Sequence, residues 1–283
     1  GMGVLFLRQT ASILSTYAAD VSGVCSALYE MGGMTVMHDA SGCNSTYNTH
    51  DEPRWYDMPS MVYISALSET EAMLGDESKI IDDISEAALE LKPRFIAIAG
   101  TPIPMMMGTD FTGMAKDIEQ RTGIPALGFA TNGMHSYLLG AGAAFKSAAE
   151  RFCLRSVRAK PLSKSPVINL LGATPLDFSV TGGIQAIKKF FEDEGFTVQS
   201  TWAMNSSWED MTNAGAAHVN IVLSACALPL AEVLKSIYGT PYVAGLPYGR
   251  GFSSALVEKV RKTASGCYEA MSAPLSSCHG VLL

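Results

Sequence analysis

The sequence predicts an α/β fold made of two Rossmann-like domains with mostly parallel sheets. Short apolar segments alternate with amphipathic helical segments along most of the chain, which favours parallel strands joined by right-handed crossovers. The length of 283 residues is sufficient for two such domains. A basic segment at residues 155–165 (RSVRAKPLSKS) interrupts the alternation, and a new series follows it. We therefore expect an N-terminal domain at residues 1–155, a second domain at 156–265 and a tail at 266–283.

The first half is predicted to contain four strands separated by helices. Asp20 and Ser22 are candidate N-cap residues of the first helix, and Ser68 with Glu71 forms a capping-box pair. The segment 100–110 (GTPIPMMMGTD) is expected to be a loop. In chain order, the expected strands span residues 34–38, 61–65, 94–99 and 126–130, and the main helices span about 20–31, 79–91, 110–121 and 141–152.

The second half repeats the same plan. We interpret the two halves as distant copies of one α/β unit, although no short repeat is present. No element is predicted in the tail. The expected strands span residues 167–171, 196–202, 219–224 and 241–244, and the helices span 181–194, 207–214, 228–238 and 252–263.

Composition excludes several classes of protein. A net charge of -7 argues against a nucleic-acid-binding protein. No apolar run reaches the ~20 residues of a membrane-spanning helix, and the start of the chain lacks the basic and apolar regions of a signal peptide. The six cysteines form no CxxC pair, which is typical of a reduced, cytoplasmic protein.

Cys25 and Cys43 are the candidate metal ligands. Both are predicted near the start of a helix, where the positive end of the helix dipole favours the thiolate form. Thiolates bind soft metals and iron–sulfur clusters, but a free cysteine is more often a small buried apolar residue. Because a cluster usually takes four ligands, the remaining ligands would come from elsewhere in the chain or from a second subunit.

Other candidate residues each have a structural alternative. A hydrogen-bonded structural role is favoured for His38, and a surface ion pair is at least as plausible as a cavity role for His50. The segment 105–107 (MMM) is expected to be apolar filler rather than cofactor padding. Helix capping is favoured over anion binding for residues 249–254 (GRGFSS). The remaining candidates are the loop at 172–183, where doubly wound folds often bind ligands, and Cys267 and Cys278 in the tail.

Several motifs resemble those of the nitrogenase component 1 family. The segment 38–43 (HDASGC) is similar to the family's H-G-x-x-G-C segment, and 49–53 (THDEP) resembles R-H-F-x-E-P. Further similar segments are 68–75, 108–110, 217–222 (AHVNIV), 238–242 (YGTPY) and 247–253. Together they cover about residues 20–265, and their order and spacing are more specific than any one motif.

The resemblance implies a cluster at a subunit interface. Cys25 and Cys43 from two subunits would supply four thiolates, which suits one shared [4Fe–4S] cluster. The implied partners are an identical or related subunit and an ATP-dependent iron protein reductase. Pro102 stands where the family often has a third cluster cysteine, and Leu223 stands where the catalytic-metallocluster cysteine would fall. The resemblance also implies a short member without the family's usual third domain.

The leading functional prediction is an oxidoreductase subunit that transfers electrons through this interface cluster to an unknown substrate. One alternative is a metallocluster or tetrapyrrole carrier without reductase activity. Another is a degenerate family member that binds a small ligand between its two domains. No catalytic residue is assigned from the sequence.

Overall fold

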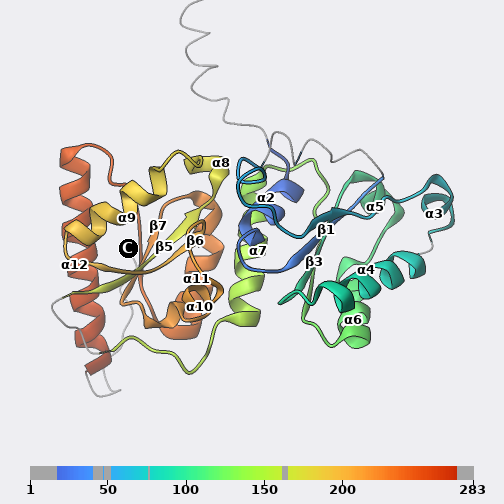
Figure 1. The fold of residues 1–283 in the computed structure, drawn as a ribbon. Coiled ribbons are helices and arrows are strands. Elements are labelled where there is room, and N and C mark those ends of the chain that lie inside the picture. Colours follow the sequence, from blue (N-terminus) through green and yellow to red (C-terminus); the bar gives the residue numbers. More distant parts are fainter. Residues whose placement is uncertain (1–17, 41–46, 48–51, 76, 161–164, 273–283) are drawn as a thin grey trace, which may run out of the picture.

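The computed structural model describes residues 18–40, 47, 52–75, 77–160 and 165–272. These residues form two four-stranded sheets in which all paired strands run parallel. The sheets lie side by side with helices between them (Figure 1). The predicted α/β fold with two parallel, Rossmann-like sheets is therefore confirmed.

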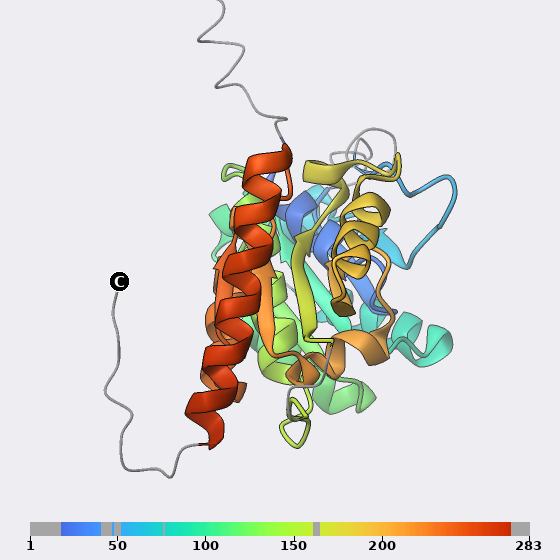
Figure 2. The same cartoon turned by 90° about the vertical axis from the view of Figure 1, so that its left-hand side faces the viewer.

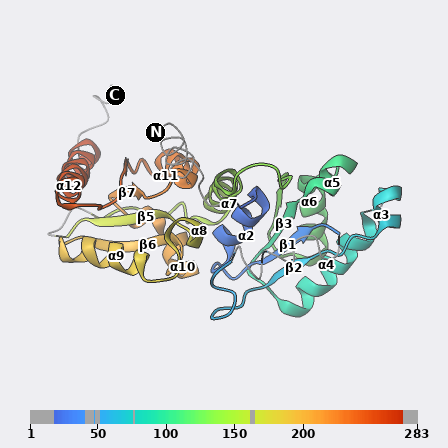
Figure 3. The same cartoon turned by 90° about the horizontal axis from the view of Figure 1, so that it is seen from above.

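The first sheet has the strand order β2-β1-β3-β4. Its strands are β1 (Met34–His38), β2 (Val62–Ile64), β3 (Ile96–Gly100) and β4 (Ala126–Phe129). The central strands β1 and β3 are buried along their whole length, which explains their nearly continuous apolar sequences. One face is covered by α4 (Ser78–Leu91) and α6 (Phe111–Thr122), and the other by α2 (Asp20–Leu28) and α7 (Tyr137–Phe152), as Figure 3 shows.

The second sheet has the order β6-β5-β7-β8, which is the same plan of second, first, third and fourth strand. Its strands are β5 (Val167–Ala173), β6 (Thr197–Ala203), β7 (Val219–Val222) and β8 (Tyr242–Ala244). The helices α9 (Gly183–Asp193) and α12 (Arg250–Ser272) cover its outer face, along which α12 runs in Figure 2. The inner face is covered by α10 (Trp208–Thr212) and α11 (Leu228–Tyr238).

A layer of helices between the two sheets joins them into one core. Within this layer the backbones of α2 and α7 cross in close contact. A Cβ atom added at Gly140 of α7 would lie only 1.8 Å from the Asp20 backbone oxygen of α2. Trp202 of β6 packs on Phe145 of α7, with ring centroids 6.1 Å apart. Since both halves contribute to this core, the predicted domain boundary near residue 155 stays a prediction.

Three local expectations differ from the structure. The segment expected to be a loop at residues 100–110 contains a short helix, α5 (Pro102–Met107), which starts with proline and ends at Gly108 in the left-handed conformation. The N-cap of α2 is Ala19, not Asp20 or Ser22. The helix α12 continues to Ser272, into the tail where no element was expected.

The remaining short helices are α3 (Glu69–Leu74) and α8 (Pro175–Phe178). The capping box predicted for Ser68 and Glu71 is present at the start of α3. None of the helices in the described part of the chain is both long and apolar enough to span a bilayer.

Candidate functional site

The carboxyl ends of the strands in both sheets lie on one side of the molecule, at the top of Figure 1. We call this side the strand-end face; it comprises residues 100–110, 130–137, 173–180, 223–228 and 245–252. The Asp177 carboxylate, after β5, accepts hydrogen bonds from Tyr137 at the start of α7 and from Ser224 after β7. These bonds join the strand ends of the two sheets. Parallel α/β sheets bind ligands at this edge, so the strand-end face is where a ligand site is expected.

In the first sheet, the strand ends carry a network of buried polar groups. His38 Nδ1 lies 2.8 Å from Ser65 Oγ, and the Thr101 hydroxyl donates to the His38 carbonyl at 2.8 Å. Burial lowers the pKa of His38, which favours its neutral imidazole. Among the described residues its Nε2 atom has no hydrogen-bond partner. The hydrogen-bonded structural role predicted for His38 therefore explains the environment of Nδ1 but not that of Nε2.

Asp20 fastens the end of β4 to the start of α2. Its carboxylate accepts from the backbone N–H groups of Gly133 at 2.7 Å and Asn132 at 3.1 Å. The sequence suggested an N-cap because Asp20 stands beside an apolar helical run. In the structure Asp20 instead forms the first residue of α2, and its side chain orders a loop of the strand-end face.

In the second sheet, buried polar groups lie near the exposed Asp177 carboxylate. The hydroxyl of Thr174 is fully buried and has no partner within the described part of the chain. Burial raises the pKa of the Cys226 thiol to about 12, and burial together with the Asp177 carboxylate raises the pKa of Tyr137. The loop at 172–183 was a sequence candidate, but Tyr137 was not, because nothing near residue 137 in the sequence indicates a partner at 177.

Large apolar side chains are exposed along the strand-end face. Met106 is 87% exposed, Tyr248 is 85% exposed and Phe252 is 80% exposed. The others are Ile103, Met105, Met134, Val180, Leu228 and Leu246. Met105 and Met106 were expected to be apolar filler, yet both project from α5 into solvent. Exposed apolar side chains that gather on one face are typical of an interaction surface.

Cys25, predicted in or near the first turn of a helix, lies in the second turn of α2. It is the sixth residue of α2 and is completely buried in the helical layer between the sheets. Burial and the nearby Glu52 carboxylate raise the pKa of its thiol, so that the neutral form is favoured. Cys43, the second predicted ligand, and His50 lie outside the described residues.

The Glu52 carboxylate beside Cys25 belongs to a buried ion network. Arg54 binds it with Nε at 2.6 Å and Nη2 at 2.7 Å, and Arg54 Nη1 donates to Glu30 at 3.0 Å. Ser26 also donates to Glu52, at 2.9 Å. This buried network connects α2 to residues 52–54.

The described residues alone do not complete a metal site. They contain no group of three or more His, Cys, Asp or Glu side chains arranged to hold a metal ion. Burial and the Glu52 carboxylate raise the pKa of Cys25 and so favour the thiol over the thiolate, which opposes metal binding in this conformation. Of the other cysteines, Cys153 and Cys226 are buried thiols, nothing is described of the Cys267 side chain, and Cys278 lies outside the described residues.

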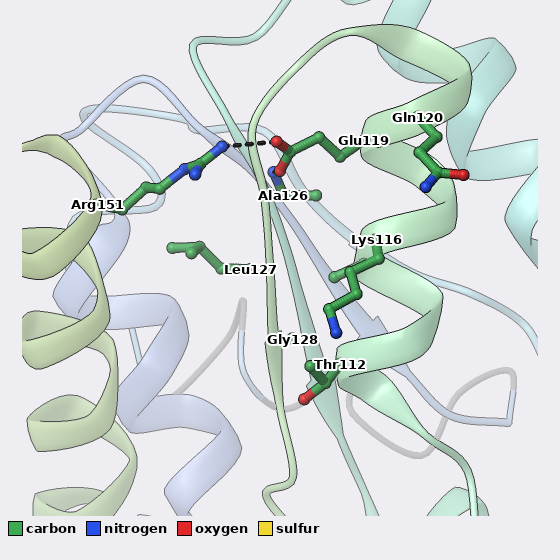
Figure 4. Close-up of a pocket in the computed structure, with 9 residues that line it drawn as sticks. Thr112, Lys116, Glu119, Gln120, Ala126, Leu127, Gly128 and Arg151 are labelled. Carbon is green, nitrogen blue, oxygen red and sulfur yellow. Dashed lines mark hydrogen bonds and ion pairs between the residues drawn. The ribbon is translucent and has the colours of Figure 1, made fainter.

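A groove also runs beside β4, at the edge of the first sheet (Figure 4). Arg151 of α7 reaches across it to Glu119 of α6 at 2.6 Å, and Glu119 accepts the outward N–H of Ala126 at 3.0 Å. Glu119 thus occupies a position where an added strand would bind. We interpret this contact as protection of an exposed sheet edge.

Comparison with known proteins places these features in a family context. The family described as nitrogenase component 1 type oxidoreductase matches residues 21–274. The nitrogenase iron-molybdenum cofactor biosynthesis protein NifE of Clostridium pasteurianum is 25% identical over 263 residues, which are 88% of this chain and 55% of NifE. One subunit of the light-independent protochlorophyllide reductase of Methylocella silvestris is 27% identical over 67% of this chain and 38% of its own length.

A solved structure shows the same fold. The structure titled nitrogenase Cp1 at pH 6.5 superposes with a TM-score of 0.67 and 18% identity, over 92% of this chain and 54% of the other. The chain therefore spans about half the length of this neighbour and of NifE.

Proposed function

Since the chain belongs to the nitrogenase component 1 type oxidoreductase family, we propose that it is an electron-transfer subunit whose strand-end face binds a second subunit. In this proposal an iron–sulfur cluster is shared at that interface, and an ATP-dependent iron protein supplies the electrons. The observation that carries the proposal is the strand-end face itself, where exposed apolar side chains surround the ends of both sheets.

Cys43 is the cysteine best supported as a ligand. It follows His38, the last residue of β1, by five positions. When bound, a [4Fe–4S] cluster would supply one-electron chemistry at the subunit interface. Cys43 of a second copy adds one thiolate, so the remaining two positions would be filled by non-cysteine ligands or by thiolates of a related subunit.

Cys25 fits the proposed cluster less well than Cys43. To act as a ligand, its thiol would have to lose its proton beside Glu52 and become uncovered from the helical layer. We therefore expect Cys43, and not Cys25, to act as a cluster ligand.

Iron and acid-labile sulfide analysis after anaerobic reconstitution tests the proposal. We expect wild-type protein and Cys25→Ser to retain iron, and Cys43→Ser to lose most of it. The matched control is Cys153→Ser, another buried thiol distant from the strand-end face. Iron-free wild-type protein would refute the cluster, and loss of iron in Cys25→Ser with Cys43→Ser unaffected would refute this ligand assignment.

A carrier without reductase activity is the second candidate. It is supported by the similarity to NifE, whose name assigns it to biosynthesis of the nitrogenase iron-molybdenum cofactor. A turnover assay with the reductase separates the two functions: a dithionite-reducible cluster that supports no turnover indicates the carrier.

A further inference from the structure

A pocket of about 160 Å³ lies between the two halves of the chain. We call it the inter-sheet pocket. The first half contributes Arg54, Asp57 and Met58, which follow the Glu52 network. The second half contributes Val180, after α8, and Met204, after β6. Ligand pockets occur preferentially at such junctions between structural units.

The charges around this pocket favour a cation over an anion. Arg54 lines it, but the Arg54 guanidinium already binds the carboxylates of Glu52 and Glu30. Counted at formal charge, these three groups sum to -1, and Asp57 at the rim brings the sum to -2. The Asp57 side chain has no ion-pair partner among the residues that the structure describes. An entering anion would meet a guanidinium whose charge is already compensated, whereas an entering cation would meet an uncompensated carboxylate.

The walls of the pocket are held in place before any ligand enters. The Tyr29 hydroxyl donates to the Met58 carbonyl at 2.6 Å, and Met58 N–H donates to the Arg54 carbonyl at 2.8 Å. On the other side, Asn205 N–H donates to Glu30 at 2.9 Å. A pocket whose walls are already ordered loses less conformational entropy on binding.

Backbone strain gathers at the same pocket. Ser179 has φ 55° and ψ -176°, a conformation that is almost restricted to glycine, and Asn205 has φ 58°. Two of the four non-glycine residues with positive φ in the described chain thus line this pocket. Strained residues of this kind are found at ligand clamps more often than elsewhere.

The apolar side chains that line the pocket indicate which kind of ligand it can accommodate. Met58, Val180 and Met204 provide aliphatic walls, and methionine adapts well to flexible alkyl chains. We propose that the inter-sheet pocket binds a small organic cation with an aliphatic body, of the class of primary alkylammonium ions. The ammonium group lies at Asp57, and the alkyl chain contacts the methionine and valine side chains. This site uses neither proposed cluster ligand, although Ser179 and Val180 also belong to the strand-end face.

Ligand-observed NMR titration of the full chain tests the site with three probes of one size. These are n-butylammonium, its uncharged analogue n-butanol and the anion butyrate. We expect saturable binding of n-butylammonium in the millimolar range, as suits so few atoms, and binding at least tenfold weaker for the other two. Tightest binding by butyrate would show that Arg54 governs the pocket, and equal binding by n-butanol would show no charge recognition. Either result, or no saturable binding, overturns the proposal.

Two variants locate the bound cation. Asp57→Asn removes the rim carboxylate and is expected to weaken n-butylammonium binding about fivefold, the scale of an exposed ion pair. Val180→Trp fills the pocket and should abolish binding. Asp193→Asn, on the outer helix α9, is the matched control and should leave the affinity unchanged. Unchanged binding in both pocket variants would place the cation elsewhere and refute the assignment.

Discussion

The Cys25 thiol lies inside the helical layer, next to the Glu52 carboxylate. Its surroundings raise the pKa of the thiol, whereas the predicted position near a helix start favours the thiolate form. At the residue scale, the decisive groups are Glu52, Arg54 and Glu30, which form a buried network of two carboxylates and one guanidinium. These groups come from two segments separated by more than twenty residues, and no local pattern in the sequence indicates their contact.

Replacing Cys25 by serine tests its structural role. We expect Cys25→Ser to lower the free energy of unfolding by about 1–3 kcal/mol, because a more polar hydroxyl group replaces a completely buried thiol. Urea denaturation measures the change, and Cys25→Ala, which adds no polar group, serves as the control. A fully stable Cys25→Ser protein that has lost its iron would instead make Cys25 a metal ligand.

Removing the charge of Glu52 tests the buried network. In Glu52→Gln the Arg54 guanidinium loses its two-point partner while it remains buried, so we expect a loss of about 3–5 kcal/mol in the free energy of unfolding. Glu71→Gln, which breaks the exposed pair between Glu71 and Lys79, should change stability little. Equal effects of the two substitutions would show that burial does not strengthen the Glu52 contact.

At the element scale, the close crossing of α2 and α7 fixes the spacing of the two sheets. The backbone of α2 touches α7 at Gly140, and the backbone of α7 touches α2 at Gly23. Glycine lowers the propensity of a helix, so its presence in both helices is explained by the short distance between them.

Substitutions at two helical glycines, one at the crossing of α2 and α7 and one away from it, test how closely these helices approach. Gly140→Ala places a methyl group against the Asp20 backbone and should cost about 1–3 kcal/mol or more, through overpacking. Gly266→Ala in α12 meets no atom within 4 Å and should stabilise the protein by about 0.5–1 kcal/mol. Thermal or urea unfolding measures both, and a neutral Gly140→Ala would contradict the close crossing.

The eight strands were predictable because each is a short apolar run between turn residues. The sequence predicted that the two halves share one α/β plan, but it did not predict the strand order that both sheets have. The local sequence pattern gave a wrong prediction where a side chain makes a long-range contact. Asp20 was predicted to cap its own helix, but its carboxylate accepts a hydrogen bond from the N–H of Asn132, 112 positions away. The helix α5 was missed because its two prolines suggested a loop, although proline is accepted in the first turn of a helix.

At the scale of the whole molecule, buried thiols couple stability to pH. Burial raises the pKa of both Cys153 and Cys226 from the ordinary value of 9.0 to about 12. Because the folded pKa lies above the unfolded one, their contribution to stability is complete below pH 9 and declines as the pH rises toward 12. Cys153 directly follows α7 and Cys226 packs against its first half, so the decline should affect the entire core.

We therefore expect the urea midpoint to fall between pH 8 and pH 10.5. Cys226→Ala, which removes one of these groups, should flatten the decline relative to its own value at pH 7. Far-ultraviolet circular dichroism at each pH measures the midpoint. A midpoint that stays level up to pH 10.5, or a slope that is unchanged in the variant, would show that the thiols are not the cause.

We propose the strand-end face as the place where two subunits and a cluster meet. Native mass spectrometry of anaerobically reconstituted protein tests it in one measurement, because it reports the number of chains and the bound iron and sulfide together. We predict two chains with about four iron and four sulfide, or the same cluster shared with one related subunit. A single chain without iron, or a pair of chains that contains none, would contradict the claim.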